Sequence, residues 1–236
     1  MKKVSDTIKK IGIVGGLSPE STIYYYKYIT QSYTKQFGDY SYPNIIIYSA
    51  TFQDYIDWGK ARDWGAMEED LVDALNALEQ AKADFAIIAT NTMHHIYDSL
   101  VKRTNIPILS LVDAVCDHAN KLDINKIGLL GTKFTMTHDF YPNALAKAGI
   151  ETLVPSPENQ TIVNDIIFDE LVKGIIRDES KSKYLKIIEE LVDQGAQGVI
   201  LGCTEIPLLI KQEDLKIHVL DSSKIHAEAA LKYALE

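Results

Sequence analysis

The sequence has few cysteines, no long apolar run and a deficit of positive charge, and each shortage argues against a class of protein. Its 236 residues include only two cysteines, Cys116 and Cys203, too few for a disulfide framework. No stretch approaches the roughly 20 apolar residues of a membrane-spanning helix. The formal net charge of −9 disfavours a nucleic-acid partner, because phosphate binding needs a basic face. We therefore expect neither a membrane nor a nucleic-acid role.

The N-terminal "MKKVSDTIKKIGIVGG" contains basic residues, but its apolar run is short and opens into two glycines. This pattern predicts a first strand rather than a signal peptide. We therefore expect a cytoplasmic protein whose two cysteines are thiols. The hydrophobic fraction of 46% and charged fraction of 24% are ordinary for a soluble globular chain.

Short, nearly continuous apolar runs alternate with longer helical patterns. Helices are predicted at 68–83 and 183–195, the second ending at Gly195. Runs covered by helices on both faces are typical of parallel strands, so the alternation predicts βαβ units. The predicted strands are 10–16, 44–50, 84–90, 107–111, 126–132, 151–155, 198–203 and 217–221.

Two pairs of these runs resemble each other at nearly equal spacing. "IGIVGG" at 11–16 matches "IGLLGT" at 127–132, and "DFAIIATNT" at 84–92 matches "QGVILGCTE" at 197–205 in hydropathy. We interpret this as internal duplication, giving two similar parallel-sheet α/β domains with the active site in the cleft between them. The predicted domains are 1–113, with the C-terminal segment 215–236 packing on it, and 114–214.

If the halves correspond, Thr90 aligns with Cys203 and Asn91 with Thr204, each where a strand leaves its sheet. Ligands of open parallel sheets bind at such ends. Near Cys203, Gly202 allows close backbone approach, and N–H donors there would lower the thiol pKa from about 8.5. A thiolate can act as a general base. Cys116 lies within a helical pattern and fits a buried structural role.

The polar residues "TNT" at 90–92 allow two interpretations that are compatible. They predict side-chain caps for the following helix, and they can orient a carboxylate or amine of a ligand. The histidines His94, His95 and His118 show no ligand spacing with acids or cysteine, so no metal site is predicted.

The loop "IGIVGGLSPEST" suggests a phosphate-binding loop but has neither the G-x-G-x-x-G nor the P-loop spacing. A nucleotide cofactor is therefore not expected. Ser18 and the helix start remain available to a small anion, and Pro19 suits a first helical position. The tyrosines of 23–29 are interpreted as core and helix-surface residues.

Together these segments resemble the aspartate/glutamate racemase family. The matching parts, in the family's order, are "GIVGGLSPES", "TFQDY", "ATNTMH", "GLLGT", "IVNDIIFDELVKG" and "VILGCTEIPLLI". The "GCTEIP" form is similar to the aspartate-racemase branch, because the glutamate-racemase branch carries His where this chain has Glu205. The resemblance implies two similar α/β domains and cofactor-independent exchange of the α-proton of an acidic amino acid, with one cysteine on each side of the substrate. It also implies a homodimer.

The resemblance also implies roles for individual residues. Cys203 matches the cysteine that acts on the L face of the substrate, and Glu205 matches a position that orients or tunes it. Lys173 lies in the matched "DELVKG" segment and is assigned to a substrate carboxylate. The other implied contacts are Asn91, Thr92 and Thr204, with Ser18, Gln53 and Thr132 as lining positions.

This chain departs from the family at position 90, where it has threonine instead of cysteine. A threonine hydroxyl is a far weaker acid than a thiol, so Thr90 is a poor base. We hypothesise asymmetric catalysis, in which Cys203 takes the α-proton of an L-amino acid and Thr90 or a bound water reprotonates the opposite face, with a relay through water or Glu205. A one-cysteine decarboxylase of the same superfamily and a non-catalytic acidic amino-acid binding protein remain open alternatives.

Overall fold

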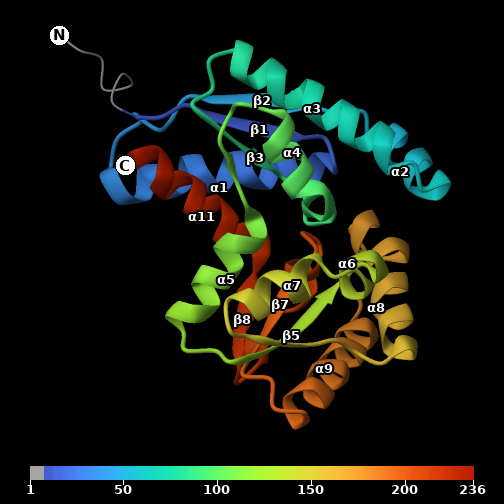
Figure 1. The fold of residues 1–236 in the computed structure, drawn as a ribbon. Helices are drawn as coiled ribbons and strands as arrows, with labels where there is room; N and C mark the ends of the chain where they lie inside the picture. Colours follow the sequence, from blue (N-terminus) through green and yellow to red (C-terminus); the bar gives the residue numbers. More distant parts are fainter. Residues whose placement is uncertain (1–7) are drawn as a thin grey trace. The chain divides into compact units, whose positions relative to one another are not determined.

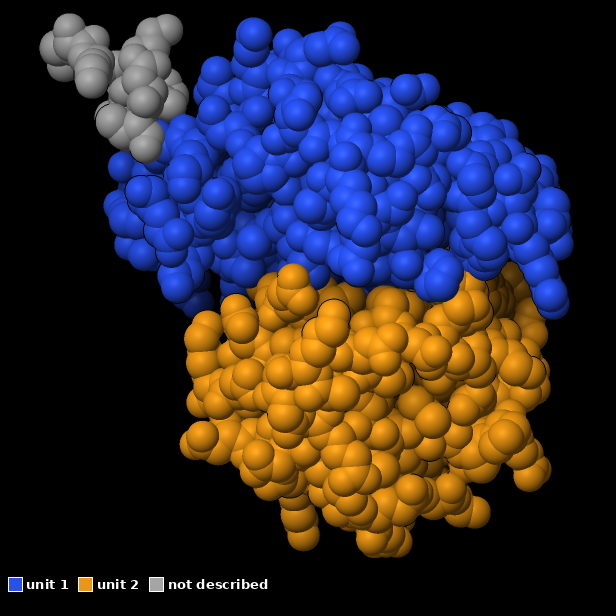
Figure 2. Space-filling model, viewed as in Figure 1, with its two compact units in different colours: residues 1–111, 226–236 blue, residues 112–225 orange. Residues whose placement is uncertain are grey.

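The computed structural model describes residues 8–236. Residues 1–7 lie outside the described residues. They belong to the N-terminal segment that we interpreted as leading to a first strand rather than as a signal peptide. The chain divides into two compact units (Figures 1 and 2). One comprises the chain up to Leu111 together with His226–Glu236, and the other comprises Val112–Ile225.

The first unit is built on a parallel sheet with the strand order β2-β1-β3-β4. The C-terminal part of α11 (Ser222–Leu235) also belongs to this unit (Figure 1). Its other elements are β1 (Ile11–Gly15), α1 (Pro19–Phe37), β2 (Ile45–Ser49), α2 (Phe52–Ala61), α3 (Trp64–Gln80), β3 (Phe85–Ile88), η2 (Thr92–Ile96), α4 (Tyr97–Arg103) and β4 (Ile108–Leu109).

The central strands of this sheet are buried on both faces, which explains their unbroken apolar sequence. Ile13 and Ile87 pack with α1 and α11, whereas the next residues, Val14 and Ile88, pack with α3. Successive strand side chains point to opposite faces, so two covered faces require an apolar residue at every position. The predicted parallel strands are confirmed.

The second unit repeats the arrangement, with the strand order β6-β5-β7-β8 and all pairs parallel. Its core lies among α8, α9 and the strands β5 and β7. The elements are α5 (Leu111–Lys121), β5 (Lys126–Gly131), α6 (Lys133–Thr137), α7 (Phe140–Lys147), β6 (Glu151–Leu153), α8 (Pro157–Asp169), η3 (Leu171–Lys173), α9 (Asp178–Asp193), β7 (Gly198–Gly202), α10 (Ile206–Leu209), η4 (Gln212–Asp214) and β8 (His218–Asp221).

The two sheets correspond strand for strand, and the sequence matches fall on corresponding strands. Strands β1 and β5 are second in their sheets, and β3 and β7 are third. The unit boundaries differ from those we expected, because β8 pairs with β7 and keeps residues up to Ile225 in the second unit. Only the segment from His226 returns to the first unit, rather than all of 215–236.

The helix ends follow the expected local chemistry, with shifts of a few residues. Pro19 lies in the first turn of α1, and the Ser18 side chain accepts a hydrogen bond from the Ser21 N–H at 3.4 Å. Gly195 follows α9 with φ of 100°, a left-handed conformation that glycine adopts at little cost. Helix α3 begins at Trp64, earlier than predicted, because Asp63 caps it through the Ala66 N–H at 3.0 Å.

Candidate active site

The strand β3 ends at Ile88, two residues before the predicted end, and Thr90, Asn91 and Thr92 follow after Ala89. Asn91 is buried, and the two threonines are half-buried. The carbonyl of Ala89, just before them, accepts a hydrogen bond from the buried Ser21 hydroxyl of α1 at 2.5 Å. This places two hydroxyls and an amide at the carboxyl end of a central strand.

The predicted side-chain cap at this point is wrong. Asn91 precedes η2 but makes no side-chain cap hydrogen bond. Its backbone is already helical, with φ of −70° and ψ of −45°, whereas the residue before a helix that caps it through its side chain typically has a non-helical backbone. Instead, the His94 N–H bonds to the Asn91 carbonyl at 3.0 Å.

The glycine-rich loop after β1 is explained by close backbone packing. Gly16 has φ of 83°, and a β-carbon there would collide with the Ala50 carbonyl oxygen. Its N–H donates to the Thr22 hydroxyl at 2.8 Å. Ser18 is half-buried and caps α1, so its hydroxyl already serves the helix start.

Cys203 and two neighbours form a compact hydrogen-bonded group at the end of β7. The Cys203 thiol donates to Glu205 Oε2 at 2.9 Å, and the Thr204 hydroxyl donates to the same oxygen at 2.7 Å. Glu205 is only 9% exposed, so its carboxylate meets these two donors in a largely dry environment. A thiol and a carboxylate in direct contact can exchange a proton.

The electrostatics of Cys203 differ from the expectation that local N–H groups favour a thiolate. Burial raises the thiol pKa well above its ordinary value, and the charge and hydrogen bond of Glu205 raise it further. The backbone N–H groups of Thr204 and Glu205 oppose this rise but do not outweigh it. The resting form is therefore the thiol. Formation of the thiolate requires that the thiol lose its proton, and the Glu205 carboxylate is close enough to accept it.

Thr132 lies at the neighbouring strand end of the same sheet. Gly131 pairs with Gly202, so Thr132 and Cys203 both follow adjacent strands at one edge. The Thr132 hydroxyl caps α6 by accepting from the Thr135 N–H at 3.3 Å. The structure thus brings together Thr132, Cys203, Thr204 and Glu205 within the second unit.

Gln53 and Lys173 are exposed, and each bonds to a residue one turn away. Gln53 Nε2 donates to Asp57 Oδ1 at 3.0 Å on α2. Lys173 Nζ lies 3.6 Å from Asp169 Oδ1. Element η3, which carries Lys173, packs against α10, the helix that follows Glu205. Lys173 is therefore in the neighbourhood of the Cys203 group, whereas Gln53 belongs to the first unit.

Cys116 has the structural role that its helical pattern predicts. It is buried in α5, where burial, followed by the charges of Asp113 and Asp117, raises its thiol pKa to about 12. Its thiol therefore stays protonated at neutral pH.

Sequence reasoning gave His94 no role, yet this side chain is buried against the backbone of Thr90. The only signal was its place four residues after Thr90.

No group of three or more His, Cys, Asp or Glu side chains in residues 8–236 is arranged to hold a metal ion. Across the same residues, every helix is too short or too polar to cross a bilayer.

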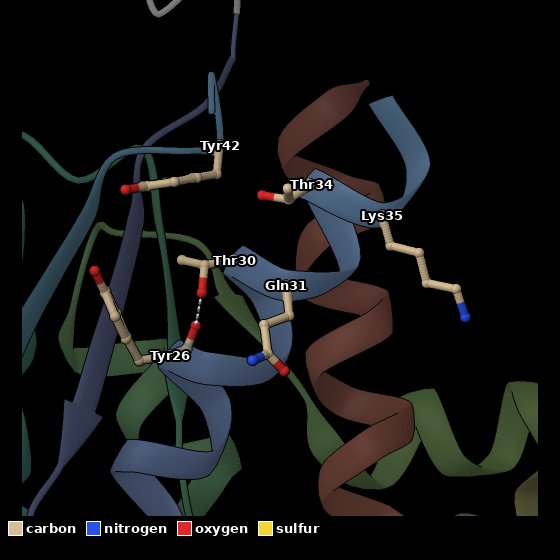
Figure 3. Close-up of a pocket in the computed structure, with 6 residues that line it drawn as sticks. All are labelled: Tyr26, Thr30, Gln31, Thr34, Lys35 and Tyr42. Carbon is tan, nitrogen blue, oxygen red and sulfur yellow. Dashed lines mark hydrogen bonds between the residues drawn. The ribbon is translucent and has the colours of Figure 1, made fainter. Parts of the chain in front are cut away.

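A hollow of about 390 Å³ lies on the surface of the first unit, and none of the predicted site residues is among the residues that line it (Figure 3). Its lining includes Tyr26, which is exposed, whereas Tyr25 of the same helix is fully buried. The predicted division of these tyrosines between core and surface is confirmed. The lining residues are Tyr26, Thr30, Gln31, Thr34 and Lys35 of α1 together with Tyr42.

Comparison with known proteins supports the resemblance to the racemase family along nearly the whole chain. The profile of the Asp/Glu/Hydantoin racemase family matches residues 14–230. The broad specificity amino-acid racemase RacX of Bacillus subtilis is 25% identical over 224 residues, covering 94% of this chain and 96% of that protein. Glutamate racemase of Aquifex aeolicus is 29% identical over 159 residues, covering 65% of this chain and 60% of that protein.

Solved structures of racemase-like proteins have the same fold as this chain. A candidate Asp/Glu racemase from Yersinia pestis superposes with a TM-score of 0.92 at 40% identity, covering 97% of this chain and 100% of that one. An aspartate racemase homologue from Pyrococcus horikoshii gives a TM-score of 0.87 at 40% identity, with the same coverage. The fold and these matches define an enzyme of the amino-acid racemase class. The chain belongs to the Asp/Glu/Hydantoin racemase family.

Proposed function

We propose that this protein is a cofactor-independent racemase of an acidic amino acid, aspartate or glutamate, that exchanges the α-proton of the L-enantiomer with solvent faster than that of the D-enantiomer. Cys203 removes the α-proton of the L-enantiomer, and the Thr90 side returns a proton to the opposite face. In this proposal Cys203, which follows β7, and Thr90, which follows β3, act on opposite faces of the substrate.

The observation that carries the proposal is the contact of the Cys203 thiol with Glu205. A half-buried thiol whose pKa is raised is a poor base alone, but a carboxylate 2.9 Å away can accept its proton. The Thr204 hydroxyl bond holds the same carboxylate oxygen in place at 2.7 Å. A purely structural cysteine does not require this partner.

The proton transfers balance in both halves of the reaction. The thiol proton moves to the Glu205 carboxylate, and the resulting thiolate takes the α-proton, so a C–H bond breaks and an S–H bond forms. The substrate electrons are held in an enolate-like carbanion. A proton from a water bound beside Thr90, or from its hydroxyl, then forms the new C–H bond on the other face. Glu205 releases its proton to solvent, which restores the hydroxyl or water.

The carbanion is the difficult intermediate, because the α-proton of an amino acid is very weakly acidic. Fixed donors aimed at the developing charge on the substrate carboxylate are the usual means of stabilising it. The amide of Asn91 and the hydroxyls of Thr92 and Thr132 are proposed to donate to the substrate carboxylate, and the Thr204 oxygen, whose hydrogen is donated to Glu205, is proposed to accept from the substrate amine. Ser18 and Gln53 would line the site, and Lys173 would meet a substrate carboxylate.

The preference for an acidic side chain is supported by the family and by these donors, whereas the B. subtilis relative carries the name of a broad specificity racemase. A screen of common amino acids is therefore part of the test. We also expect a cytoplasmic homodimer, which size-exclusion chromatography with light scattering would check for the oligomeric state.

The decisive experiment is α-proton exchange in D₂O, measured by NMR from L- and D-aspartate and L- and D-glutamate separately. We expect exchange from the L-enantiomer to be the faster. Equal exchange from both enantiomers would contradict the asymmetric assignment. Ligand-dependent thermal stabilisation without exchange would instead indicate a binding protein, and CO₂ release from an arylmalonate would indicate a decarboxylase.

A further inference from the structure

A buried imidazole connects the end of β3 to the point where the chain leaves the first unit. His94 Nδ1 lies 2.9 Å from the Thr90 carbonyl oxygen, and the Leu111 N–H points to His94 Nε2 at 2.9 Å. His94 is only 4% exposed. Leu111 is the last residue of the first unit before the chain enters the second.

These contacts determine the tautomer of His94. The backbone N–H of Leu111 can only donate, so Nε2 must be the unprotonated acceptor. The ring proton therefore resides on Nδ1 and is donated to the Thr90 carbonyl. Stacking on Tyr97, with ring centroids 5.8 Å apart and planes 9° from parallel, fixes the ring orientation. Burial lowers the His94 pKa to about 4, so the ring is neutral at neutral pH.

The far end of this bridge is itself held in place. The Tyr97 hydroxyl donates to the Ile108 carbonyl at 2.8 Å, and His226 Nε2 lies 3.0 Å from the Leu109 carbonyl. Together with the N–H of Leu111, three backbone groups of the segment 108–111 are bound by buried or half-buried side chains. The imidazole therefore ties Thr90 to a fixed segment rather than to a loose one.

We propose that His94 is a positioning residue that sets the backbone of Thr90 and Asn91 and, through it, the direction in which their side chains meet the substrate. This inference rests on the proposed function, in which the Thr90 side serves one face of the substrate. The backbone N–H of His94 also bonds the Asn91 carbonyl at 3.0 Å, a contact that any residue keeps, so the part that depends on the imidazole is the bond to the Thr90 carbonyl. The Ala89 carbonyl is held separately by Ser21.

The inference makes a specific kinetic prediction, because Cys203 serves the other face. Loss of His94 should slow α-proton exchange from the D-enantiomer about tenfold more than exchange from the L-enantiomer, as expected for one lost buried hydrogen bond. His226→Ala is the comparison variant. His226 is also buried, and it bonds the Leu109 carbonyl, so its loss loosens the far end of the bridge but leaves the bond from His94 to Thr90 in place. It should lower the ratio of D to L exchange less than His94→Ala does.

A pair of variants of similar volume tests the same point if His94→Ala fails to fold. In His94→Asn the amide nitrogen can occupy the place of Nδ1 and keep the donor to Thr90, whereas His94→Gln extends its amide toward the place of Nε2 and loses that donor. We expect His94→Asn to retain the wild-type ratio of D to L exchange and His94→Gln to lower it. An unchanged ratio in both His94→Gln and His94→Ala would overturn the inference.

Amide hydrogen exchange separates this inference from the proposed function. We expect His94→Gln to increase amide exchange in a peptide spanning residues 88–92 more than His226→Ala does. If the wild-type protein exchanges no α-proton, the racemase proposal fails, and the amide data still decide whether His94 holds the Thr90 backbone. Unchanged protection of residues 88–92 in His94→Gln would count against it.

Discussion

The ends of β3 and β7 occupy the same place in two sheets of identical strand order, yet they are stabilised in different ways. After β3, buried side chains bind the backbone, through Ser21 to Ala89 and through His94 to Thr90. After β7, the side chains bind each other, and both the thiol and the hydroxyl donate to the carboxylate of Glu205.

The difference is also one of charge. The Thr90 carbonyl accepts from a neutral imidazole and the Ala89 carbonyl from a hydroxyl, whereas the Cys203 thiol donates to a carboxylate. One topology can thus carry a fixed, neutral strand end and an acid–base strand end. Strand position decides where a residue is presented, and its neighbours decide which chemistry it can perform.

The largest expected effect is loss of the acid–base group itself. Cys203→Ser should lower α-proton exchange from L-aspartate by about 10² to 10⁴, the usual range for a general acid–base catalyst. The measurement is NMR-detected exchange in D₂O. Cys116→Ser is the control, because Cys116 is buried in α5 and its thiol is held protonated. If both variants lose exchange equally, the assignment of Cys203 is wrong.

Glu205 has two effects on the Cys203 thiol, because it raises the thiol pKa and accepts the thiol proton. Its replacement should lower exchange from L-aspartate about 10²-fold, the second largest effect. Glu205→Gln removes the carboxylate that raises the Cys203 pKa through charge and hydrogen bonding, so that pKa should fall. The thiol should then react with iodoacetamide at a lower pH than in the wild type. Exchange from L-aspartate should nevertheless decrease, because the proton acceptor is gone. Faster alkylation together with faster exchange would show that Glu205 only suppresses the thiolate.

The neutral strand end should respond to acid through its buried histidines. Burial lowers the His94 pKa to about 4 and, together with the neighbouring His94, lowers that of His226 to about 3. Unfolded histidine binds protons below about pH 6.5. The stability from the neutral rings is therefore complete above that pH and is lost as the pH falls toward 4.

By pH 5, His94 alone should cost about 2 kcal/mol of unfolding free energy relative to pH 7. Urea denaturation at both pH values measures this loss. His94→Asn should reduce the dependence on pH, whereas His95→Asn, a change at the adjacent exposed residue, should not. An identical pH dependence in all three proteins would disprove the assignment to His94.

The strands and the positions of Thr90 and Cys203 could be predicted because buried parallel strands leave a continuous apolar record in the sequence. The start of α1 after β1 could also be predicted, because Ser18 and Pro19 are residues that favour the first turn of a helix. The boundary at Ile225 was not, because it depends on the pairing of β8 with β7.

Two features of the site depended on contacts that a linear pattern does not contain. The raised pKa of Cys203 reflects burial and the side-chain direction of Glu205, whereas the sequence shows only that the two residues are close. The bridge through His94 joins Thr90 to Leu111, which is 17 residues further along the chain than the histidine itself. Only the folded backbone brings that N–H to the imidazole.

The smallest expected effect comes from making the two strand ends more alike. Thr90→Cys should raise exchange from D-aspartate about tenfold and leave exchange from L-aspartate nearly unchanged, because a thiol is a far stronger acid than a hydroxyl. The gain should stay modest, since Cys203 has Glu205 to accept its proton and Thr90 is bound through its backbone to a neutral imidazole. Thr92→Cys, which adds a thiol two residues away, is the control and should give no gain. A larger increase for the L-enantiomer would place Thr90 on the same face as Cys203.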